Sequence, residues 1–263
     1  MTGLLLRLAA PMQSWGERSV FSAVRDTAPF PTRSGLTGIF AAAEGLPRGA
    51  ALDRYNCLQF TVRVDRPGIR MTDYHTVGGG FPDRHTAATS GGKNKGAAVL
   101  TSRHYLADAV FVVAVTGPED RIDEIDRALR QPHWAPYLGR RACIPDEPFL
   151  LGAGVSDPVG ELLSRIPLTG PHTDERTGPP LQPSSRTVPV DFLWEQAPGD
   201  GREAVHHTSN DHPVSFGVHT HAHRKRHIYR TVQQLPADLL EHGECTVHER
   251  LIDYALQHAE TPA

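Results

Sequence analysis

The hydrophobic positions near the N-terminus predict a strand followed by a helix. Residues 4–10, LLLRLAA, form an apolar run with leucines alternating on one face, which is typical of a buried strand. From residue 34 the apolar side chains recur every three or four residues, on one helix face made by Leu36, Ile39, Phe40 and Ala43. Thr32 or Ser34 can cap the start of this helix, and Gly45 and Pro47 end it.

Residues 57–65, CLQFTVRVD, alternate strictly and are predicted to form a second strand. One set of side chains is apolar: Leu58, Phe60, Val62 and Val64. Gln59, Thr61 and Arg63 point the other way. We therefore expect one face of the sheet to be polar.

Residues 107–131 predict a further strand and helix. The run 107–115, ADAVFVVAV, is apolar throughout, as a central strand would be. A helix begins near Pro118 and ends before Pro132, with its buried face made by Ile122, Ile125 and Leu129. With one more strand near 147–152, this order indicates an α+β protein with a ferredoxin-like, RRM-like βαββαβ unit.

Residues 66–106 interrupt that order with a glycine-rich, polar and basic insertion. Six arginines and lysines stand against two aspartates, a local net charge of +4. Long segments of this kind are usually functional or disordered.

The C-terminal part has weaker patterns. Residues 156–204 are rich in Pro, Gly and Asp and are predicted to be loop, whereas 212–232 suggest a strand pair with a basic turn and 247–259 a short amphipathic helix. We expect residues 1–155 to form the RRM-like domain and 156–263 a smaller, β-rich extension packed on it.

Charge and cysteine content restrict the possible functions. The chain has 263 residues and a formal net charge of −3, so a site for a polyanion must be a local patch. Cys57, Cys143 and Cys245 are far apart and are expected to be reduced thiols. The N-terminal apolar run is too short to span a bilayer and lacks a signal-peptide layout, so we expect a cytoplasmic protein with no membrane partner.

Two segments near the N-terminus combine residues suited to RNA. In APFPTRSGLTGIF, Arg33 and Ser34 lie at a helix start, where unpaired N–H groups attract phosphate; the alternative is an ordinary capped helix with a solvated arginine. In APMQSWGERS, Trp15 could stack on a base while Gln13 hydrogen-bonds its edge; the alternative is a tryptophan buried under the loop.

Two further segments combine arginines with aromatic residues. In APYLGRRACIP, Tyr137, Arg140 and Arg141 could stack on a base and clamp phosphates, or could simply be solvated. The basic insertion is flanked by aromatic and basic side chains: Tyr74, His75, Arg103, His104 and Tyr105.

The same insertion leaves a catalytic alternative open. His75 or His85 could act as acid or base, with Lys93 or Lys95 stabilising the charged transition state, in RNA cleavage that needs no metal. The segment SGGKNKG is not a nucleotide P-loop.

A cluster of histidines offers a third possible function, metal binding. Seven of the fifteen histidines lie between 206 and 227, and His219, His221 and His223 would share one face of a strand. No carboxylate or cysteine stands beside them and HRKRH follows, so a basic surface strand is favoured over a metal site. We expect neither a metal nor another cofactor.

Four segments in series resemble the CasD family, the type I-E CRISPR-associated subunit of the RNA-guided Cascade complex. They are LLLRLAAPMQSWG, FPTRSGLTGIFAAAEGL, DYHTV at 73–77 and PYLGRR at 136–141, and the match covers about residues 3–155. The C-terminal third matches only loosely, with DHPV where the family has a DEPV-like segment.

The resemblance implies an RRM-like fold whose β-hairpin thumb is the insertion at 66–106. It implies a non-catalytic subunit that caps one end of the complex by holding the 5′ handle of the mature CRISPR RNA. Its thumb would pack against the adjacent backbone subunit, and it would also contact the large subunit. Target DNA is then recognised indirectly, by base pairing with the guide. It also favours an RNA-facing helix start at Arg33 and Ser34. The candidate RNA-binding residues are Gln13, Trp15, Arg25, Arg33, Ser34, Tyr74, His75, Arg103, Tyr105, Tyr137, Arg140 and Arg141.

Overall fold

The computed structural model describes residues 2–17, 23–78, 98–170, 186–199, 204–217, 220–240 and 245–259. These residues form an α+β structure with two sheets, whose strands pair antiparallel except for one short parallel pair. No helix in these ranges is long and apolar enough to cross a membrane.

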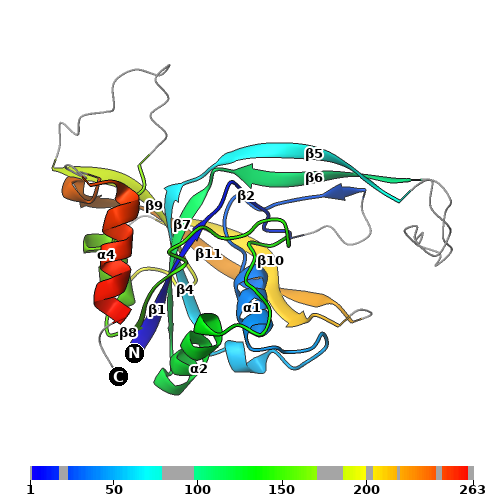
Figure 1. Ribbon diagram of the computed structural model, residues 1–263, viewed down its shortest axis with the longest axis horizontal. Coiled ribbons are helices and arrows are strands. Elements are labelled where there is room, and N and C mark those ends of the chain that lie inside the picture. The colour runs from blue at the N-terminus through cyan, green and yellow to red at the C-terminus, as the bar shows by residue number, and fades with distance from the viewer. Residues whose placement is uncertain are drawn as a thin grey trace, which may run out of the picture.

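The main sheet has seven strands in the order β10-β11-β9-β4-β7-β1-β8 (Figure 1). Their bounds are β1 Thr2–Ala9, β4 Gln59–Arg66, β7 Val110–Gly117, β8 Leu150–Val155, β9 Thr187–Trp194, β10 Val205–Ser215 and β11 Ala222–Pro236. β1 pairs with β7 along its whole length, from Thr2 opposite Gly117 to Ala9 opposite Val110. The predicted strands 4–10, 57–65 and 147–152 are therefore confirmed within a few residues.

Helices cover both faces of this sheet. α1 Arg33–Ala43 and α2 Glu119–Arg130 pack on one face, where Leu4, Leu6 and Leu8 of β1 point. α3 Pro158–Ser164 and α4 Val247–Ala259 pack on the other face, which receives Leu5. As predicted, α1 is capped by Thr32, whose hydroxyl accepts a hydrogen bond from the Gly35 amide at 3.2 Å.

The expectation of a polar sheet face is wrong at Arg63, which is fully buried. The Arg63 guanidinium forms a salt bridge with Asp65 at 2.7 Å. It also donates to the carbonyl oxygens of Leu162, Ile166 and Pro167 at 2.8 to 3.0 Å. The end of α3 and the segment after it thus cover this face and use the arginine as their hydrogen-bond donor.

A second, smaller sheet is built around β6 Val99–Ala107. It pairs with β5 Ile69–Val77, with β2 Met12–Gln13 and, in parallel, with β3 Val24–Arg25. β5 and β6 run side by side and extend away from the main sheet (Figure 1). They account for the two ends of the basic insertion, whereas His85, Lys93 and Lys95 lie outside the described residues.

The predicted strand 107–115 begins later than expected. β6 continues to Ala107, and a tight turn at Asp108, whose φ is 55°, leads into β7 at Val110. The insertion therefore leads directly into the central strand, although β6 and β7 belong to different sheets.

The C-terminal part contains more regular structure than its composition suggested. α3 and β9 lie within 156–204, where loop was predicted. β9 pairs with β4 on one side and β11 on the other, so the C-terminal strands continue the N-terminal sheet. The strand pair near 212–232 and the helix 247–259 are confirmed, but Arg224, Lys225 and Arg226 lie on β11 rather than in the turn.

Replacing Arg63 by alanine is expected to lower the free energy of unfolding by about 3–5 kcal/mol, because the Asp65 carboxylate would stay buried without its charged partner. Urea unfolding of the purified chain measures this change. The control is Arg130→Ala, which removes a solvent-exposed pair with Asp126 and is expected to cost about 0.5 kcal/mol or less. Equal effects of the two substitutions would contradict the buried-pair interpretation.

Candidate nucleic-acid interface

Arg33, the candidate phosphate ligand at the start of α1, is buried. Its guanidinium contacts both carboxylate oxygens of Glu195 at 2.7 and 2.8 Å. It also donates to the carbonyl oxygens of Tyr55 and Leu58 and lies 5.0 Å from the centre of the Phe60 ring. Only 4% of the residue is exposed, and both terminal nitrogens of the guanidinium are hydrogen-bonded within the protein.

The N-terminus of α1 already holds an anion, the carboxylate of Asp211 on β10. The Arg33 amide donates to Asp211 Oδ2 at 2.7 Å, and Arg226 donates to both oxygens of the same carboxylate. Burial alone would raise the pKa of Asp211, but the hydrogen bonds and charge of Arg226 and the Arg33 amide hold it below its ordinary value.

The expectation that Arg33 faces RNA is therefore corrected. A helix start attracts negative charge, but here the chain supplies that charge itself.

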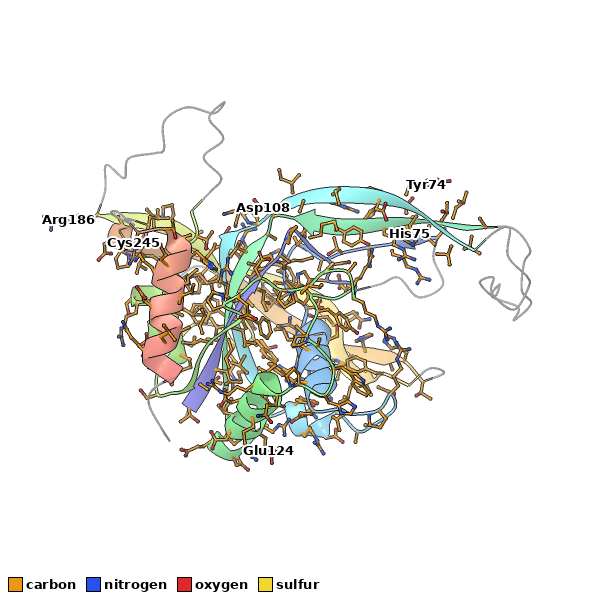
Figure 2. The ribbon with its side chains drawn as sticks, in the orientation of Figure 1. Tyr74, His75, Asp108, Glu124, Arg186 and Cys245 are labelled. Carbon is orange, nitrogen blue, oxygen red and sulfur yellow. The ribbon has the colours of Figure 1, made fainter. Side chains whose placement is uncertain are left out.

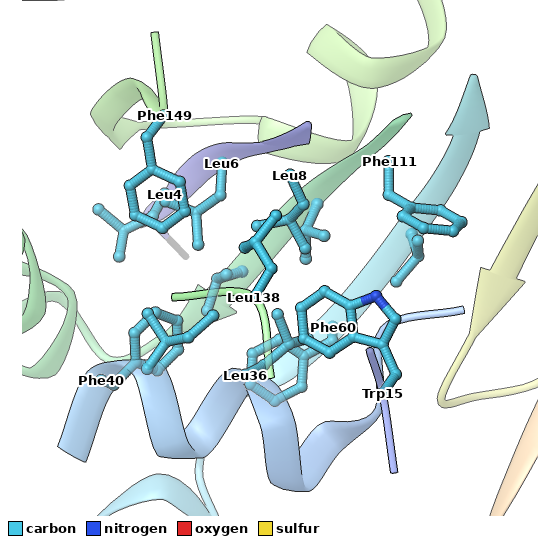
Figure 3. Packing of buried hydrophobic residues seen from close by; sticks show 14 of the residues in the cluster. Leu4, Leu6, Leu8, Trp15, Leu36, Phe40, Phe60, Phe111, Leu138 and Phe149 are labelled. Atoms are coloured by element: carbon cyan, nitrogen blue, oxygen red, sulfur yellow. The ribbon is translucent and has the colours of Figure 1, made fainter. Parts of the chain in front are cut away.

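Gln13 and Trp15 are also internal. The Gln13 side chain is fully buried, donates to the carbonyl oxygens of Leu8 and Ala109, and accepts a hydrogen bond from the Trp15 indole at 3.1 Å. Trp15 is 1% exposed and lies in the core cluster with Leu36 of α1 and Leu138 (Figure 3). The alternative prediction, a tryptophan buried under the loop, is therefore correct, and Trp15 cannot stack on a base.

Three predicted arginines converge on one cavity. Arg25, Arg103 and Arg140 line a cavity of about 260 Å³, together with Ser14, Gly16, Asp26 and Gly139. Arg25 on β3 is paired in register with Arg103 on β6, whereas Arg140 comes from the loop that follows Tyr137. Residues that are far apart in the sequence thus form one cationic site.

Arg140 is held in place from two sides. Its guanidinium stacks over the Tyr105 ring, 4.5 Å from the centroid, and its Nη2 donates to the Arg25 carbonyl oxygen at 3.2 Å. Its Nη1 is buried and has no hydrogen-bond partner within the described part of the chain. A buried donor left unpaired in a cationic cavity is suited to an anionic ligand. Tyr105 is 6% exposed, so it positions Arg140 and does not stack on a base.

Glycine at position 139 allows the loop to approach the N-terminal segment closely. Gly139 has a φ of +85°, and a Cβ there would lie 1.6 Å from the Ser14 carbonyl oxygen. The Ser14 amide donates to the Leu138 carbonyl oxygen at 3.1 Å. Any side chain at position 139 would therefore push Arg140 away from Arg25.

Tyr74 and His75 lie on the hairpin, away from the body of the molecule (Figure 2). Tyr74 is 67% exposed, and the His75 ring is 3.3 Å from the Asp73 carboxylate. Successive strand residues point to opposite faces, and Asp73 is the register partner of Arg103. His75 therefore shares the face of Arg103, whereas Tyr74 lies on the opposite face.

The remaining predicted residues, Ser34, Tyr137 and Arg141, line a second cavity on the other side of the loop. The Ser34 hydroxyl donates to the Thr32 hydroxyl at 3.3 Å. Sequence reasoning missed Asp26 in the first cavity and Trp134 in the second. Trp134 stands two residues before the PYLGRR segment, and this proximity could have identified it from the sequence. No sequence feature pointed to Asp26.

Four of the described histidines of the cluster form two pairs. His206 Nε2 lies 2.7 Å from His227 Nδ1, and the rings of His221 and His223 are 4.7 Å apart. Within the described ranges no three metal-binding side chains come together. His219 lies outside those ranges.

Comparisons relate the chain to known proteins. The family described as "CRISPR-associated protein (Cas_Cas5)" matches residues 3–232. The curated "CRISPR system Cascade subunit CasD" of Escherichia coli (strain K12) is 37% identical over 212 residues, which cover 73% of this chain and 91% of the relative. A chain of a solved "CRISPR RNA-guided surveillance complex" is 46% identical with a TM-score of 0.82, and covers 97% of this chain and 100% of that chain. A solved "Cas protein" is 25% identical with a TM-score of 0.53, covering 90% and 97%.

The depressed pKa of Asp211 predicts a pH-dependent effect of Asp211→Asn. The carboxylate contributes stability above its unfolded-state pKa, and this contribution is lost as the pH falls through the lower folded-state pKa. We expect the variant to be about 3–5 kcal/mol less stable than the wild type at pH 7, because the buried network keeps both arginines, Arg33 and Arg226, but loses one of its two carboxylates. The difference should shrink below about pH 4, near the ordinary pKa of aspartate.

Urea unfolding at pH 7 and pH 3 measures this dependence. Asp126→Asn, which alters a surface pair with Arg130, serves as the control. A difference between the wild type and Asp211→Asn that stays constant between the two pH values would show that the charge of Asp211 does not stabilise the fold.

Proposed function

The chain belongs to the CRISPR-associated Cas5 family, as its resemblance to CasD predicted, and on this premise we propose that it is a non-catalytic, RNA-binding subunit of a Cascade-type surveillance complex. In this proposal it holds the 5′ handle of the mature CRISPR RNA at one end of the complex. The support from relatives is that CasD is a Cascade subunit by name and that the 46% identical chain comes from an RNA-guided complex.

The observation that carries the proposal is the cavity formed by Arg25, Arg103 and Arg140. Arginine binds phosphate through paired N–H groups and keeps its charge at every physiological pH. With one aspartate in the lining, the cavity has a local net charge of +2 in a chain whose formal net charge is −3. We infer that it takes one or more phosphates of the RNA backbone, which position the strand without reading its sequence.

The lining of the cavity also supports a binding role rather than catalysis. The ionisable side chains among its described lining residues are the three arginines and Asp26. Arginine cannot release a proton near neutral pH, so these arginines stabilise charge and do not transfer protons.

The order β4-β7-β1-β8, with α1 after β1 and α2 after β7, supports a ferredoxin-like unit.

We infer that the β5–β6 hairpin is a thumb that packs against the adjacent backbone subunit, since Ile69, Tyr74 and Leu100 are exposed on it. The large subunit would complete the RNA site, and target DNA would be recognised by base pairing.

Arg103→Ala and Arg140→Ala are each expected to weaken binding of CRISPR repeat RNA and to reduce its dependence on salt. Each lost phosphate contact on a single strand lowers the slope of log affinity against log salt concentration by about 0.7. Filter binding over a range of salt measures the slope, with the chain alone and with the chain assembled with partner subunits. Arg130→Ala is the control, because Arg130 lies on the exposed side of α2 in a pair with Asp126.

Wild-type slopes in both cavity variants would rule out the arginine cavity as the RNA site. The same samples, incubated with chelator and run on a denaturing gel, should contain intact RNA. Cleavage at one position, lost in a His75→Ala variant, would show that the chain is a metal-independent endoribonuclease instead.

A further inference from the structure

Two histidine side chains on the C-terminal strands lie in direct contact at the surface. His206 is on β10 and His227 is on β11, 21 residues later in the sequence. Nε2 of His206 is 2.7 Å from Nδ1 of His227, and the ring centroids are 4.8 Å apart. Both side chains are exposed, and neither lines the arginine cavity.

The register of the two strands places both rings on one face of the sheet. His206 is opposite Tyr229 and Thr208 is opposite His227, so the two histidines are diagonal neighbours. Arg226, one position before His227, points to the opposite face, where it contacts the carboxylate at the start of α1. The histidine pair is therefore separated from α1 by the sheet.

The backbone that carries the pair is fixed on both sides. β11 pairs with β10 along one edge and with β9 along the other. The Tyr229 ring packs against the His206 ring, with 5.2 Å between the centroids. The sheet thus sets the separation of the two histidine backbones, while the exposed imidazoles remain able to rotate.

The contact between the two nitrogens has the chemistry of a metal chelate. One imidazole donates its N–H and the other accepts, so a single proton lies between them. Neutral imidazole is the commonest metal ligand in proteins. Two nitrogens that each bind one ion at about 2.0–2.1 Å are about 2.9–3.4 Å apart when they are adjacent ligands. Opening the pair by about 0.5 Å, with each ring turned toward the ion, meets this requirement. The displaced proton then moves to the other nitrogen of its ring.

The surroundings of the pair favour a nitrogen-binding transition metal over Mg²⁺ or Ca²⁺. Asp211 is the one acidic residue of β10 and β11, and it points to the opposite face, toward Arg226. The face of the pair instead carries Lys225, two positions before His227. Mg²⁺ and Ca²⁺ need oxygen ligands, whereas imidazole suits Cu²⁺, Ni²⁺ and Zn²⁺.

Other histidines of these strands are not arranged for chelation. Nε2 of His212 is already 2.7 Å from Nη2 of Arg224 and 3.1 Å from Oδ1 of Asn56. The rings of His221 and His223 meet edge to face, so that one ring meets the face of the other and not its nitrogen. The contact of two facing nitrogens distinguishes His206 and His227 from these residues.

We propose that His206 and His227 form a two-histidine chelate for a divalent first-row transition metal ion, with Cu²⁺ bound more tightly than Ni²⁺ or Zn²⁺. Among the described residues no third metal-binding side chain joins the pair, so water or a donor from another molecule fills the remaining positions. The site goes beyond the proposed function and does not depend on RNA binding.

Calorimetric titration of the full, untagged chain with Cu²⁺ tests the site. We expect the tightest binding step to take one ion per chain. His206→Asn and His227→Asn should each weaken this step about 100-fold, the lower end of the gain from two linked donors. Electron paramagnetic resonance with one equivalent of Cu²⁺ should show two nitrogen ligands in the wild type and one in either variant.

His207→Asn is the matched control. His207 is exposed and adjacent to His206 in the sequence, but it is opposite Ile228 and therefore lies on the other face. This variant should bind Cu²⁺ as the wild type does. Because all three substituted side chains are exposed, the variants should also retain the wild-type stability in urea.

Wild-type affinity for Cu²⁺ in both His206→Asn and His227→Asn would overturn the proposal. An equal loss in all three variants would also overturn it, since Cu²⁺ would then bind diffusely to the histidine-rich strands. Filter binding of CRISPR repeat RNA without metal separates the site from the proposed function. Both chelate variants should bind RNA as the wild type does, whereas weaker RNA binding would assign the pair to the RNA site instead.

Discussion

The buried ion-pair network at the start of α1 determines where this helix lies against the sheet. Arg33 and Arg226 contribute two positive charges, and Glu195 and Asp211 contribute two negative ones, so the network is balanced. Arg33 is separated from its partners Glu195 and Asp211 by 162 and 178 residues of sequence. Because an unpaired buried charge is costly, α1 and the C-terminal strands must come together as the chain folds.

Packing contacts connect α1 to the candidate RNA site, so the position of the helix affects the geometry of the site. Trp15 lies against Gly35, where a Cβ would come within 2.7 Å of the ring, so its place depends on the helix. The adjoining Ser14 meets the loop at Gly139, and the loop presents Arg140 to the cavity. Residues that looked like RNA ligands, such as Trp15, thus support the ligands instead. Because buried residues support the site and only a few arginines line it, a chain of net negative charge can hold a small cationic site.

The elements with a sustained apolar period, β1, α1, β4, α2 and α4, could be predicted from the sequence. α3 and β9 could not, because their Pro- and Gly-rich surroundings hide short elements that only tertiary pairing stabilises. The burial of Arg33 and Arg63 depends on partners far away in the sequence, so a local pattern assigns both to the surface. Arg103 and Arg140 were identified from basic and aromatic neighbours. Their convergence with Arg25 depends on β3, a strand of two residues with no period to detect.

The most direct measurement of the phosphate site replaces single phosphates of the RNA strand by neutral methylphosphonates, one position at a time. Binding is compared between the wild type and Arg103→Ala in the assembled complex. If Arg25, Arg103 and Arg140 hold a phosphate, a methylphosphonate at one position, or at either of two adjacent positions, will weaken binding to the wild type. The same substitution will have little further effect on the variant. If the methylphosphonate weakens binding equally at every position and in both proteins, the RNA backbone is held elsewhere and the arginine cavity is not the site.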